Sequence, residues 1–150
     1  MNLKSVVMSL CVAFMQSSAS AESADAAQVH RVALDYIDGW YTKDPVRMER
    51  ALHPQMIKRL VGVDAATKKS YLDEGSALRL VQATRPLPGR PIPPLGTQRR
   101  EVQVLDVFGD AATVKIDATE WVDYLHLGRW NGEWKILNVL WERKPAAQER

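Results

Sequence analysis

The chain has 150 residues, of which 46% are hydrophobic and 25% are charged, and its formal net charge is +2. This length and composition are typical of one ordinary globular domain. With 20 basic and 18 acidic residues, the chain lacks the strong positive charge that binding to nucleic acid or to an anionic membrane would use. Composition therefore argues against those two classes of partner, and any function has to be found in individual motifs.

The first residues, 1–21, have the features of a secretory signal peptide. A lysine precedes an apolar run over residues 6–15, and Ala19-Ser20-Ala21 places small residues where a signal peptidase cleaves. The apolar run is about half of the roughly 20 residues that span a bilayer, so an N-terminal membrane anchor is the weaker interpretation. We expect cleavage near Ala21, export to the periplasm or the extracellular space, and a single mature domain over residues 22–150.

The single cysteine, Cys11, lies inside this segment. Met8-Ser9-Leu10 before it lacks the small residues of a lipoprotein cleavage site, so we expect no lipid anchor. The mature chain then has no cysteine and can form no disulfide, and its stability must come from an apolar core. Cleavage also removes one lysine and no acid, which lowers the formal charge from +2 to +1.

Two helices are predicted at the start of the mature chain. Apolar residues recur with the helical repeat from Val29 to Trp40, which indicates one face of an amphipathic helix. Asp44 is placed to cap a second, shorter helix that begins at Pro45, where the missing N–H group is not needed. Pro54 is expected to stop this second helix.

The middle of the chain predicts a hairpin, a third helix and a loop. Residues 55–74 combine short apolar pairs with a polar turn, which favours a two-stranded hairpin. Ser76 is placed to cap a third helix that continues to about Ala83. Residues 85–96 contain five prolines and two glycines, so we expect an extended surface loop there rather than a linker to a second domain.

The last part of the chain predicts two β-hairpins. Alternating apolar residues flank Gly109-Asp110 over residues 99–119, and a second hairpin runs from Trp121 to Trp141. The turn of the second hairpin is Asn131-Gly132, which suits the two positive φ angles of a type I′ turn.

The final strand is predicted to be apolar on both faces. Strict alternation places Trp134, Ile136, Asn138 and Leu140 on one face and Lys135, Leu137, Val139 and Trp141 on the other. A strand of this kind needs cover on both sides. We therefore expect helices against one face of the sheet and a loop, a chain terminus or the second subunit of a homodimer against the other.

Helices first and then consecutive strands joined by tight turns indicate an α+β fold, with the helices on one face of a bent antiparallel sheet. Several stretches also resemble the putative lumazine-binding family of the nuclear transport factor 2-like superfamily. They are residues 34–41 (LDYIDGWY) with Asp44, 51–54 (ALHP), 80–82 (LVQ), 105–107 (LDV), 123–127 (DYLHL) and 131–136 (NGEWKI). The resemblance covers nearly the whole mature chain. It implies a cone of three helices and a strongly bent sheet around a pocket, often paired into dimers.

The resemblance is more specific for fold than for activity. The superfamily includes isomerases, dehydratases, polyketide cyclases and transport adaptors. Its steroid-isomerase-like members use an acidic base and a buried acid donor, and no carboxylate of this sequence aligns with that pattern. No catalytic residue is therefore transferred, and no cofactor is expected.

The candidate ligand-binding residues are aromatic, histidine and amide side chains. We predict that they line one pocket, and they are Tyr36, Trp40, His53, Tyr124, His126 and Asn138. Alternation places Tyr124 and His126 on one strand face and Asp123 on the other. A histidine titrating near pH 6.5 can act as a general base, which makes His53 and His126 the catalytic candidates, with Tyr124 or Tyr36 as the donor.

Each candidate also has a structural interpretation. His53 would bond to the backbone at the end of the second helix, and His126 would lie on a half-exposed strand. The aromatic side chains would pack in the core or in a dimer interface. His30, His53 and His126 fall on different elements without a ligand spacing, so no metal site is predicted.

Two functions are consistent with these observations. The favoured one is an exported module that holds a small apolar or heterocyclic ligand in an aromatic-lined pocket without converting it. The alternative is a small, cofactor-free lyase or isomerase, including dehydratases and cyclases, that transfers protons in the same pocket.

Overall fold

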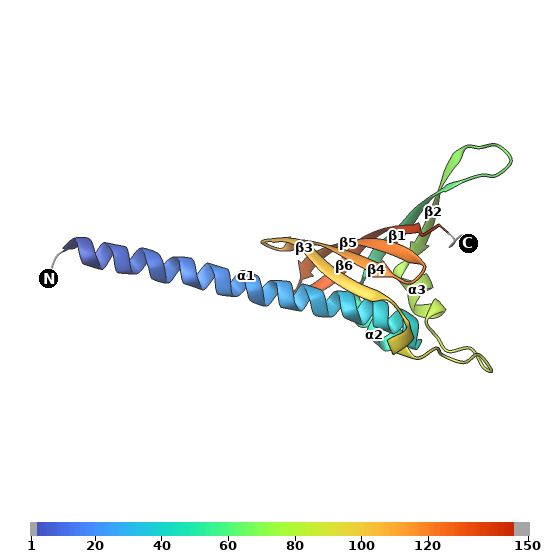
Figure 1. Ribbon diagram of the computed structural model, residues 1–150, viewed down its shortest axis with the longest axis horizontal. Helices are drawn as coiled ribbons and strands as arrows, with labels where there is room; N and C mark the ends of the chain where they lie inside the picture. The colour runs from blue at the N-terminus through green and yellow to red at the C-terminus, as the bar shows by residue number, and fades with distance from the viewer. Residues whose placement is uncertain (1–2, 146–150) are drawn as a thin grey trace, which may run out of the picture.

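Two helices, two strands, a third helix and a short 3-10 helix precede a run of four strands, which completes a six-stranded sheet (Figure 1). The computed structural model describes residues 3–145. The elements are α1 (Leu3–Thr42), α2 (Pro45–Ala51), β1 (Leu52–Val63), β2 (Ser70–Ser76), α3 (Ala77–Ala83), the 3-10 helix η1 (Leu95–Thr97), β3 (Arg100–Phe108), β4 (Ala111–Ala118), β5 (Trp121–Trp130) and β6 (Glu133–Arg143). This order confirms the expected α+β fold.

The first helix, α1, is longer than its predicted apolar face. It runs unbroken for 40 residues, and its first half extends away from the sheet, whereas its second half lies across one sheet face (Figure 1). The residues of α1 that are buried in the core begin at Val29 and include Ala33, Tyr36 and Ile37. Among residues 3–145, no helix combines the length and the hydropathy needed to cross a membrane.

The start of α2 follows the prediction, but its end does not. The Asp44 carboxylate accepts hydrogen bonds from the backbone N–H groups of Val46 and Arg47 at 3.0 and 3.1 Å, and Pro45 is the first helical residue. The helix ends at Ala51, before the expected stop at Pro54. His53 and Pro54 therefore lie in β1, where the pairing of β1 with β6 is irregular between Leu52 and Ile57. A proline there has no N–H group to donate to the ladder.

The strand order is β2-β1-β6-β5-β4-β3. All neighbouring strands are antiparallel except β1 and β6, which are parallel. The predicted hairpin over residues 55–74 is confirmed as β1 and β2, although β1 begins earlier, at Leu52. The outer part of this hairpin projects beyond the rest of the sheet (Figure 1).

A β-bulge in β6 changes the expected alternation of the final strand. Leu127 pairs with Ile136 and His126 pairs with Asn138, so Leu137 is an extra residue in β6. Relative to the residues before Leu137, the residues after it consequently face the opposite way from the predicted pattern. An added Cβ at Gly128 would lie 2.7 Å from Leu137 Cδ1, so the glycine leaves the space that Leu137 occupies.

This bulge explains why the sequence predicts apolar residues on both faces of β6. Ile136 and Val139 are both buried, although an odd spacing separates them, and Asn138 and Leu140 are exposed. The expectation of two fully apolar faces was wrong because it assumed uninterrupted alternation. The buried apolar residues of β6 lie on one face, and the alternation of buried and exposed residues shifts by one position at Leu137.

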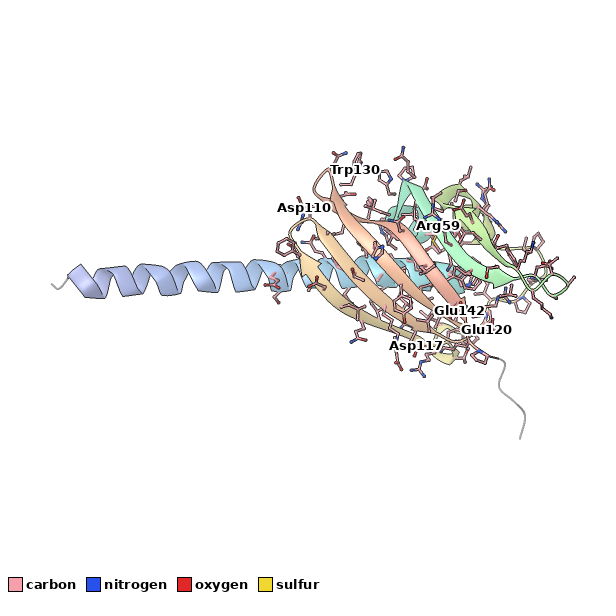
Figure 2. All side chains as sticks on the ribbon, turned by 90° about the horizontal axis from the view of Figure 1, so that it is seen from above. Arg59, Asp110, Asp117, Glu120, Trp130 and Glu142 are labelled. Carbon is pink, nitrogen blue, oxygen red and sulfur yellow. The ribbon has the colours of Figure 1, made fainter. Side chains whose placement is uncertain are left out.

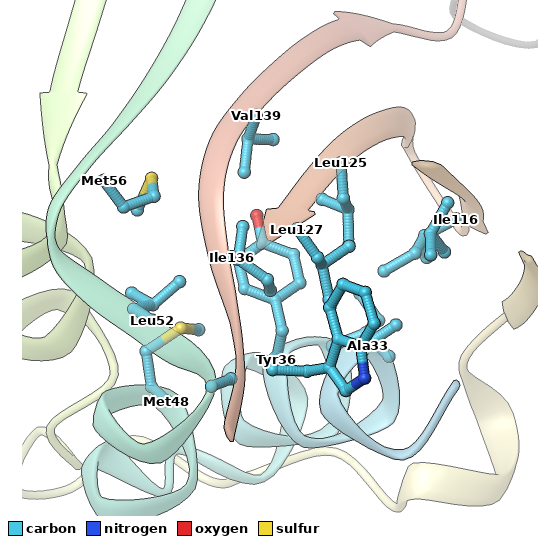
Figure 3. Close-up of a cluster of buried hydrophobic side chains, with 14 of the residues drawn as sticks. Ala33, Tyr36, Met48, Leu52, Met56, Ile116, Leu125, Leu127, Ile136 and Val139 are labelled. Carbon is cyan, nitrogen blue, oxygen red and sulfur yellow. The ribbon is translucent and has the colours of Figure 1, made fainter. Parts of the chain in front are cut away.

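The core lies between the second half of α1, the helix α2 and the inner face of the sheet. Figure 3 shows Tyr36 and Ala33 of α1 facing Leu125, Leu127 and Ile136 of the two central strands. Each fully buried aliphatic side chain contributes about 1.5 to 3 kcal/mol through removal of apolar surface from water. This core fixes α1 against the sheet and so positions the groups beside it.

Candidate functional site

A cavity of about 1020 Å³ opens at one end of the fold, where α1, α3 and the ends of several strands meet. Its volume is at the upper end of the range of small-molecule pockets. Four aromatic residues line it, namely Tyr36 and Trp40 of α1, Trp121 of β5 and Trp141 of β6. Charged side chains contribute most of the polar lining, and these are Lys58, Asp73, Arg79, Glu120, Arg143 and Lys144.

Four side chains form a hydrogen-bonded cluster beside the cavity, and we call Lys58, Asp123, Tyr36 and Trp121 the polar cluster. Lys58 Nζ donates to Asp123 Oδ1 at 2.6 Å and to the Tyr36 hydroxyl oxygen at 2.8 Å. Trp121 Nε1 donates to Asp123 Oδ2 at 2.7 Å, and the Tyr36 hydroxyl lies 3.4 Å from the same oxygen. Both carboxylate oxygens therefore have partners, as a buried charge requires.

Local structure explains how these four residues meet. On β5, Asp123 shares its phase with Leu125 and Leu127, so all three point to the buried side of the sheet. On β1, Lys58 pairs in parallel with Val139, a buried residue of β6. Tyr36 comes from the buried side of α1, which lies across this sheet face.

The polar cluster has an inner and an outer part. The Asp123 side chain is fully buried, whereas 15% of the Lys58 side chain is exposed, and Lys58, Tyr36 and Trp121 line the cavity. A molecule that enters the cavity would therefore meet the amine and the phenol first. The carboxylate lies behind them and holds them in place.

Three aromatic rings surround the Lys58 ammonium group. Its Nζ atom lies 4.9 Å from the ring centroid of Trp141, 5.5 Å from that of Tyr36 and 5.9 Å from that of Trp121. At these distances the ring faces attract a cation. The rings also exclude water, which strengthens the interaction of Lys58 with Asp123.

Burial shifts the proton affinities of two members of the polar cluster. Loss of water raises the pKa of Tyr36 well above its usual value, and the negative charge of Asp123 adds to this effect. Burial lowers the pKa of Lys58, and the carboxylate of Asp123 partly opposes that change. The phenol therefore stays protonated, while the amine gives up its proton more readily than an exposed lysine.

Two of the six predicted ligand-binding residues line the cavity, namely Tyr36 and Trp40. His53 lies elsewhere, on β1. Its Nδ1 atom accepts a hydrogen bond from the Gln55 backbone N–H at 3.1 Å, and its ring meets the Trp130 ring edge-on at 4.9 Å. Trp130 and Glu120 lie at opposite ends of the sheet (Figure 2), and Glu120 lines the cavity. His53 is therefore remote from the cavity.

The remaining predicted residues, Tyr124, His126 and Asn138, are exposed on the outer face of the sheet. The expectation that Tyr124 and His126 share a strand face is confirmed, but that face points away from α1. Asn138 joins them because the bulge at Leu137 reverses its direction, and it pairs with His126 across β5 and β6. These three side chains do not line the cavity.

Lys58 and Asp123 were not singled out as site residues from the sequence. A signal for Asp123 was present, because it is the only acidic residue in phase with Leu125 and Leu127 on β5. A carboxylate at such a position must have partners inside the fold. No comparable signal marked Lys58, because the irregular pairing around Pro54 hides the phase of β1.

Within residues 3–145, no group of three or more His, Cys, Asp or Glu side chains converges in a way that could hold a metal ion.

A sequence model of one protein family, described as "Putative lumazine-binding", matches residues 24–142. This range contains α2, α3, the part of α1 that packs in the core and all six strands except the last residue of β6. No curated protein matches the sequence.

Solved structures with the same fold include an NTF2-like protein of unknown function from Shewanella baltica. It is 20% identical, with a TM-score of 0.59, and the alignment covers 83% of this chain and 97% of that one. A ketosteroid isomerase-like protein from Erwinia carotovora atroseptica is 10% identical, with a TM-score of 0.53 and coverage of 81% and 98%. The association domain of C. elegans CaMKII is 14% identical, with a TM-score of 0.52 and the same coverage. At these identities the likeness concerns the fold alone.

Proposed function

The chain belongs to the Putative lumazine-binding family, and from this premise we propose that its mature domain binds a flat aromatic or heterocyclic small molecule in the cavity. The observation that carries the proposal is the combination of aromatic walls with a buried polar cluster. A small-molecule site needs an apolar body for affinity and a few fixed polar groups for orientation.

The walls suit a planar ligand. Trp40 and Trp121 meet edge-on with ring centroids 6.3 Å apart, and Tyr41 packs against Trp121 in a tilted arrangement at 5.7 Å. These contacts hold the indole of Trp121 in one orientation, so that a ligand ring can stack on it without ordering it first. Affinity would come mainly from burial of ring surface.

The polar cluster would fix the orientation of such a ligand. Lys58 Nζ has three N–H donors, and Asp123 and Tyr36 take two of them. The third is available to a carbonyl oxygen or a ring nitrogen of the ligand. A hydrogen bond from a charged donor contributes about 1.5 to 3 kcal/mol when it is buried.

Binding is tested by a thermal-shift screen of heteroaromatic compounds on the mature protein, followed by titration of any hit with tryptophan fluorescence. Replacing Trp121 by Leu should weaken a hit by about 1 to 3 kcal/mol, because the variant removes a stacking surface. His53→Ala is the matched control, since His53 lies at the other end of the sheet, and it should bind as the wild type does. Equal weakening by both variants, or no hit at all, would count against the proposal.

A second candidate function is general acid–base catalysis on the bound ligand. The polar cluster favours it, because a carboxylate, an amine of lowered pKa and a protonated phenol are already hydrogen-bonded beside the cavity. The residues for such an isomerase or lyase would be Asp123, Lys58 and Tyr36. They replace the earlier catalytic candidates His53, His126 and Tyr124, which lie outside the cavity.

Export of the domain remains part of the proposal. The core residues of α1 begin at Val29, and the ion pair between Asp25 and Arg129, at 2.6 Å, also follows the proposed cleavage site. Cleavage after Ala21 would therefore leave the packed part of α1 intact. Mass spectrometry of the protein from its native host should find a chain that starts at or near Glu22, and an intact N-terminus in the cytoplasm would contradict this.

A homodimer through the outer sheet face is also proposed. We call the exposed residues Tyr124, His126, Asn138 and Leu140 the outer-face patch. Tyr124 and Leu140 are cross-strand neighbours with 42% and 52% of their surface exposed. A second copy placed on this patch would cover both, and the histidine and the amide could form hydrogen bonds across the interface.

A further inference from the structure

Lys58 combines features that a purely structural ion pair does not need. Its Nζ atom lies at the cavity and is surrounded by aromatic rings. A negatively charged carboxylate and a neutral phenol both accept hydrogen bonds from it. A carboxylate that can accept its proton lies at 2.6 Å, and a phenol that can relay a proton lies at 2.8 Å. An amine in this setting can act as a nucleophile as well as a donor.

We propose that Lys58 forms a reversible imine with a flat aromatic ligand that carries an aldehyde or ketone group. This inference rests on the proposed function, because it names the chemical class of ligand for the same cavity. The aromatic walls would hold the ring system, and the carbonyl carbon would lie against Lys58 Nζ.

The first steps use groups that already touch Lys58. Asp123 takes one proton from the Lys58 ammonium and leaves a neutral amine. The nitrogen lone pair forms a bond to the carbonyl carbon, while the π electrons of the C=O bond move to the oxygen. The Tyr36 hydroxyl gives its proton to that oxygen and receives one from the nitrogen, which became positively charged on attack, and this yields a neutral carbinolamine.

The last step releases water. Asp123 returns its proton to the carbinolamine hydroxyl, the C–O bond breaks, and the nitrogen lone pair forms the C=N bond. In sum, one ammonium and one carbonyl give one protonated imine and one water, and the charge next to Asp123 stays at one positive unit. The final state therefore keeps the ion pair that the fold already contains.

Electrostatics favour Lys58 over the other lysines of the mature chain. Burial lowers the pKa of Lys58, so that a larger share of it is neutral at a given pH than of an exposed lysine. Lys43 provides a comparison, because burial lowers its pKa too. Lys43 stacks on the Trp40 ring at 4.4 Å but does not line the cavity.

Reductive trapping tests the inference on the mature wild-type protein. The probe is 2-naphthaldehyde with sodium cyanoborohydride at neutral pH, and peptide mass spectrometry locates the reduced adducts. We expect Lys58 to be labelled at least about tenfold faster than the exposed Lys68 and Lys69, because the cavity holds the aldehyde beside Lys58 Nζ. Lys43 should react more slowly than Lys58, because it lies outside the cavity.

Two further arms separate specific from general reactivity. An excess of 2-naphthol, which has the same rings and no carbonyl, should slow the labelling of Lys58 and leave Lys68 and Lys69 unchanged. Lys58→Arg keeps the positive charge beside Asp123 and should lose the fast adduct. If that variant does not fold, the distribution of adducts in the wild-type protein still decides the question.

The outcomes distinguish this inference from the proposed function. Adducts spread evenly over the lysines, or faster reaction at Lys43, would overturn the imine. If 2-naphthol still quenches tryptophan fluorescence in that case, ligand binding stands and only the imine fails. If 2-naphthol does not bind and Lys58 is not labelled, both fail.

Discussion

The ion pair between Lys58 and Asp123 is the residue-scale feature on which the site depends. A buried ion pair is costly to desolvate, and replacing it by apolar side chains is often neutral or stabilising. The Lys58 and Asp123 side chains are 15% and 0% exposed, so this general cost applies to them. Their presence beside a cavity is therefore explained better by function than by stability.

Separate and combined substitutions test that view. Lys58→Met should lower the free energy of unfolding by about 3 to 5 kcal/mol, because it leaves the Asp123 carboxylate buried without its cation. The double variant Lys58→Met, Asp123→Leu should recover most of this loss while abolishing ligand binding. Urea titrations of the wild-type protein, both single variants and the double variant measure the coupling. A double variant that is no more stable than Lys58→Met would contradict this view.

Tyr36 predicts a specific alkaline loss of stability. Its folded pKa is raised well above the usual value of 10.0, so the folded state holds the phenol proton more tightly than the unfolded state. The resulting stabilisation is complete below pH 10 and is lost as the pH rises from 10 towards the folded pKa, by about 1.4 kcal/mol per pH unit. Burial lowers the pKa of Lys58, so its contribution to stability changes with pH in the opposite direction. Lys58 is present in both the wild type and Tyr36→Phe, so the comparison of these two proteins isolates Tyr36.

Urea unfolding between pH 8 and pH 11 measures this effect. The stability of Tyr36→Phe should fall less steeply above pH 10 than that of the wild type. The control is Tyr71→Phe on β2, which is exposed and lies outside the outer-face patch, and it should follow the wild type. Parallel curves for Tyr36→Phe and the wild type would contradict the burial of the phenol.

At the scale of elements, the helices and the hairpin turns were predictable because their signals are local. The Asp44 cap, Pro45 at the first helical position and the Asn131-Gly132 turn each depend on neighbouring residues only. Both residues of that turn have positive φ angles, 51° and 81°, as a type I′ turn requires.

The bulge at Leu137 was not predictable in this way. The Leu137 side chain occupies space beside Gly128, which is nine residues away in sequence, across the hairpin. The register depends on this pairing between strands. One extra residue reversed the direction of Asn138. Asn138 therefore lies with Tyr124 and His126 on the outer face, whereas the site lies on the opposite face, the side of Asp123.

The junction of α1 and α2 depends on a cluster of charges. Arg50 and Arg47 donate hydrogen bonds to Asp35, and Arg47 also pairs with Asp38, which Arg100 of β3 contacts from the other side. Mainly the hydrogen bonds from Arg50, with help from Arg47, lower the pKa of Asp35 below its usual value of 3.8. This ion-pair cluster holds α2 against the helix that carries Tyr36 and Trp40.

The lowered pKa of Asp35 predicts a loss of stability in acid. Its contribution is present above pH 3.8 and is lost as the pH falls through the folded pKa. Asp35→Asn should cost roughly 0.5 to 1 kcal/mol at pH 7, and the difference from the wild type should shrink below pH 4. The exposed Asp106→Asn is the control and should show no such difference. A gap that stays constant from pH 7 to pH 2 would contradict the ion-pair explanation.

At the scale of the whole molecule, the two faces of the sheet have different roles. The inner face forms the core and carries the polar cluster at one end, whereas the outer face carries the outer-face patch. Five of the six residues first considered for a pocket are thus divided between these roles: Tyr36 and Trp40 lie at the cavity, and Tyr124, His126 and Asn138 are available to a partner subunit.

The outer-face patch predicts a dimer of the mature protein. A stable contact should bury at least about 1,000 Å² in total. Light scattering should give twice the monomer mass at tens of micromolar, and Leu140→Glu should give the monomer, because it places a charge in the middle of the contact. Val61→Glu, on the projecting part of β1, is the control and should remain dimeric. A wild-type protein that is monomeric at this concentration would contradict the dimer.

The most direct measurement of the central claim is a crystal structure of the mature protein soaked with the tightest hit of the heteroaromatic screen. We predict that the ligand lies in the cavity, with its rings against Trp121 and Trp141 and a polar atom within hydrogen-bond distance of Lys58 Nζ. Density for the ligand beside His53 at the opposite end of the sheet, or on the outer-face patch, would contradict the account.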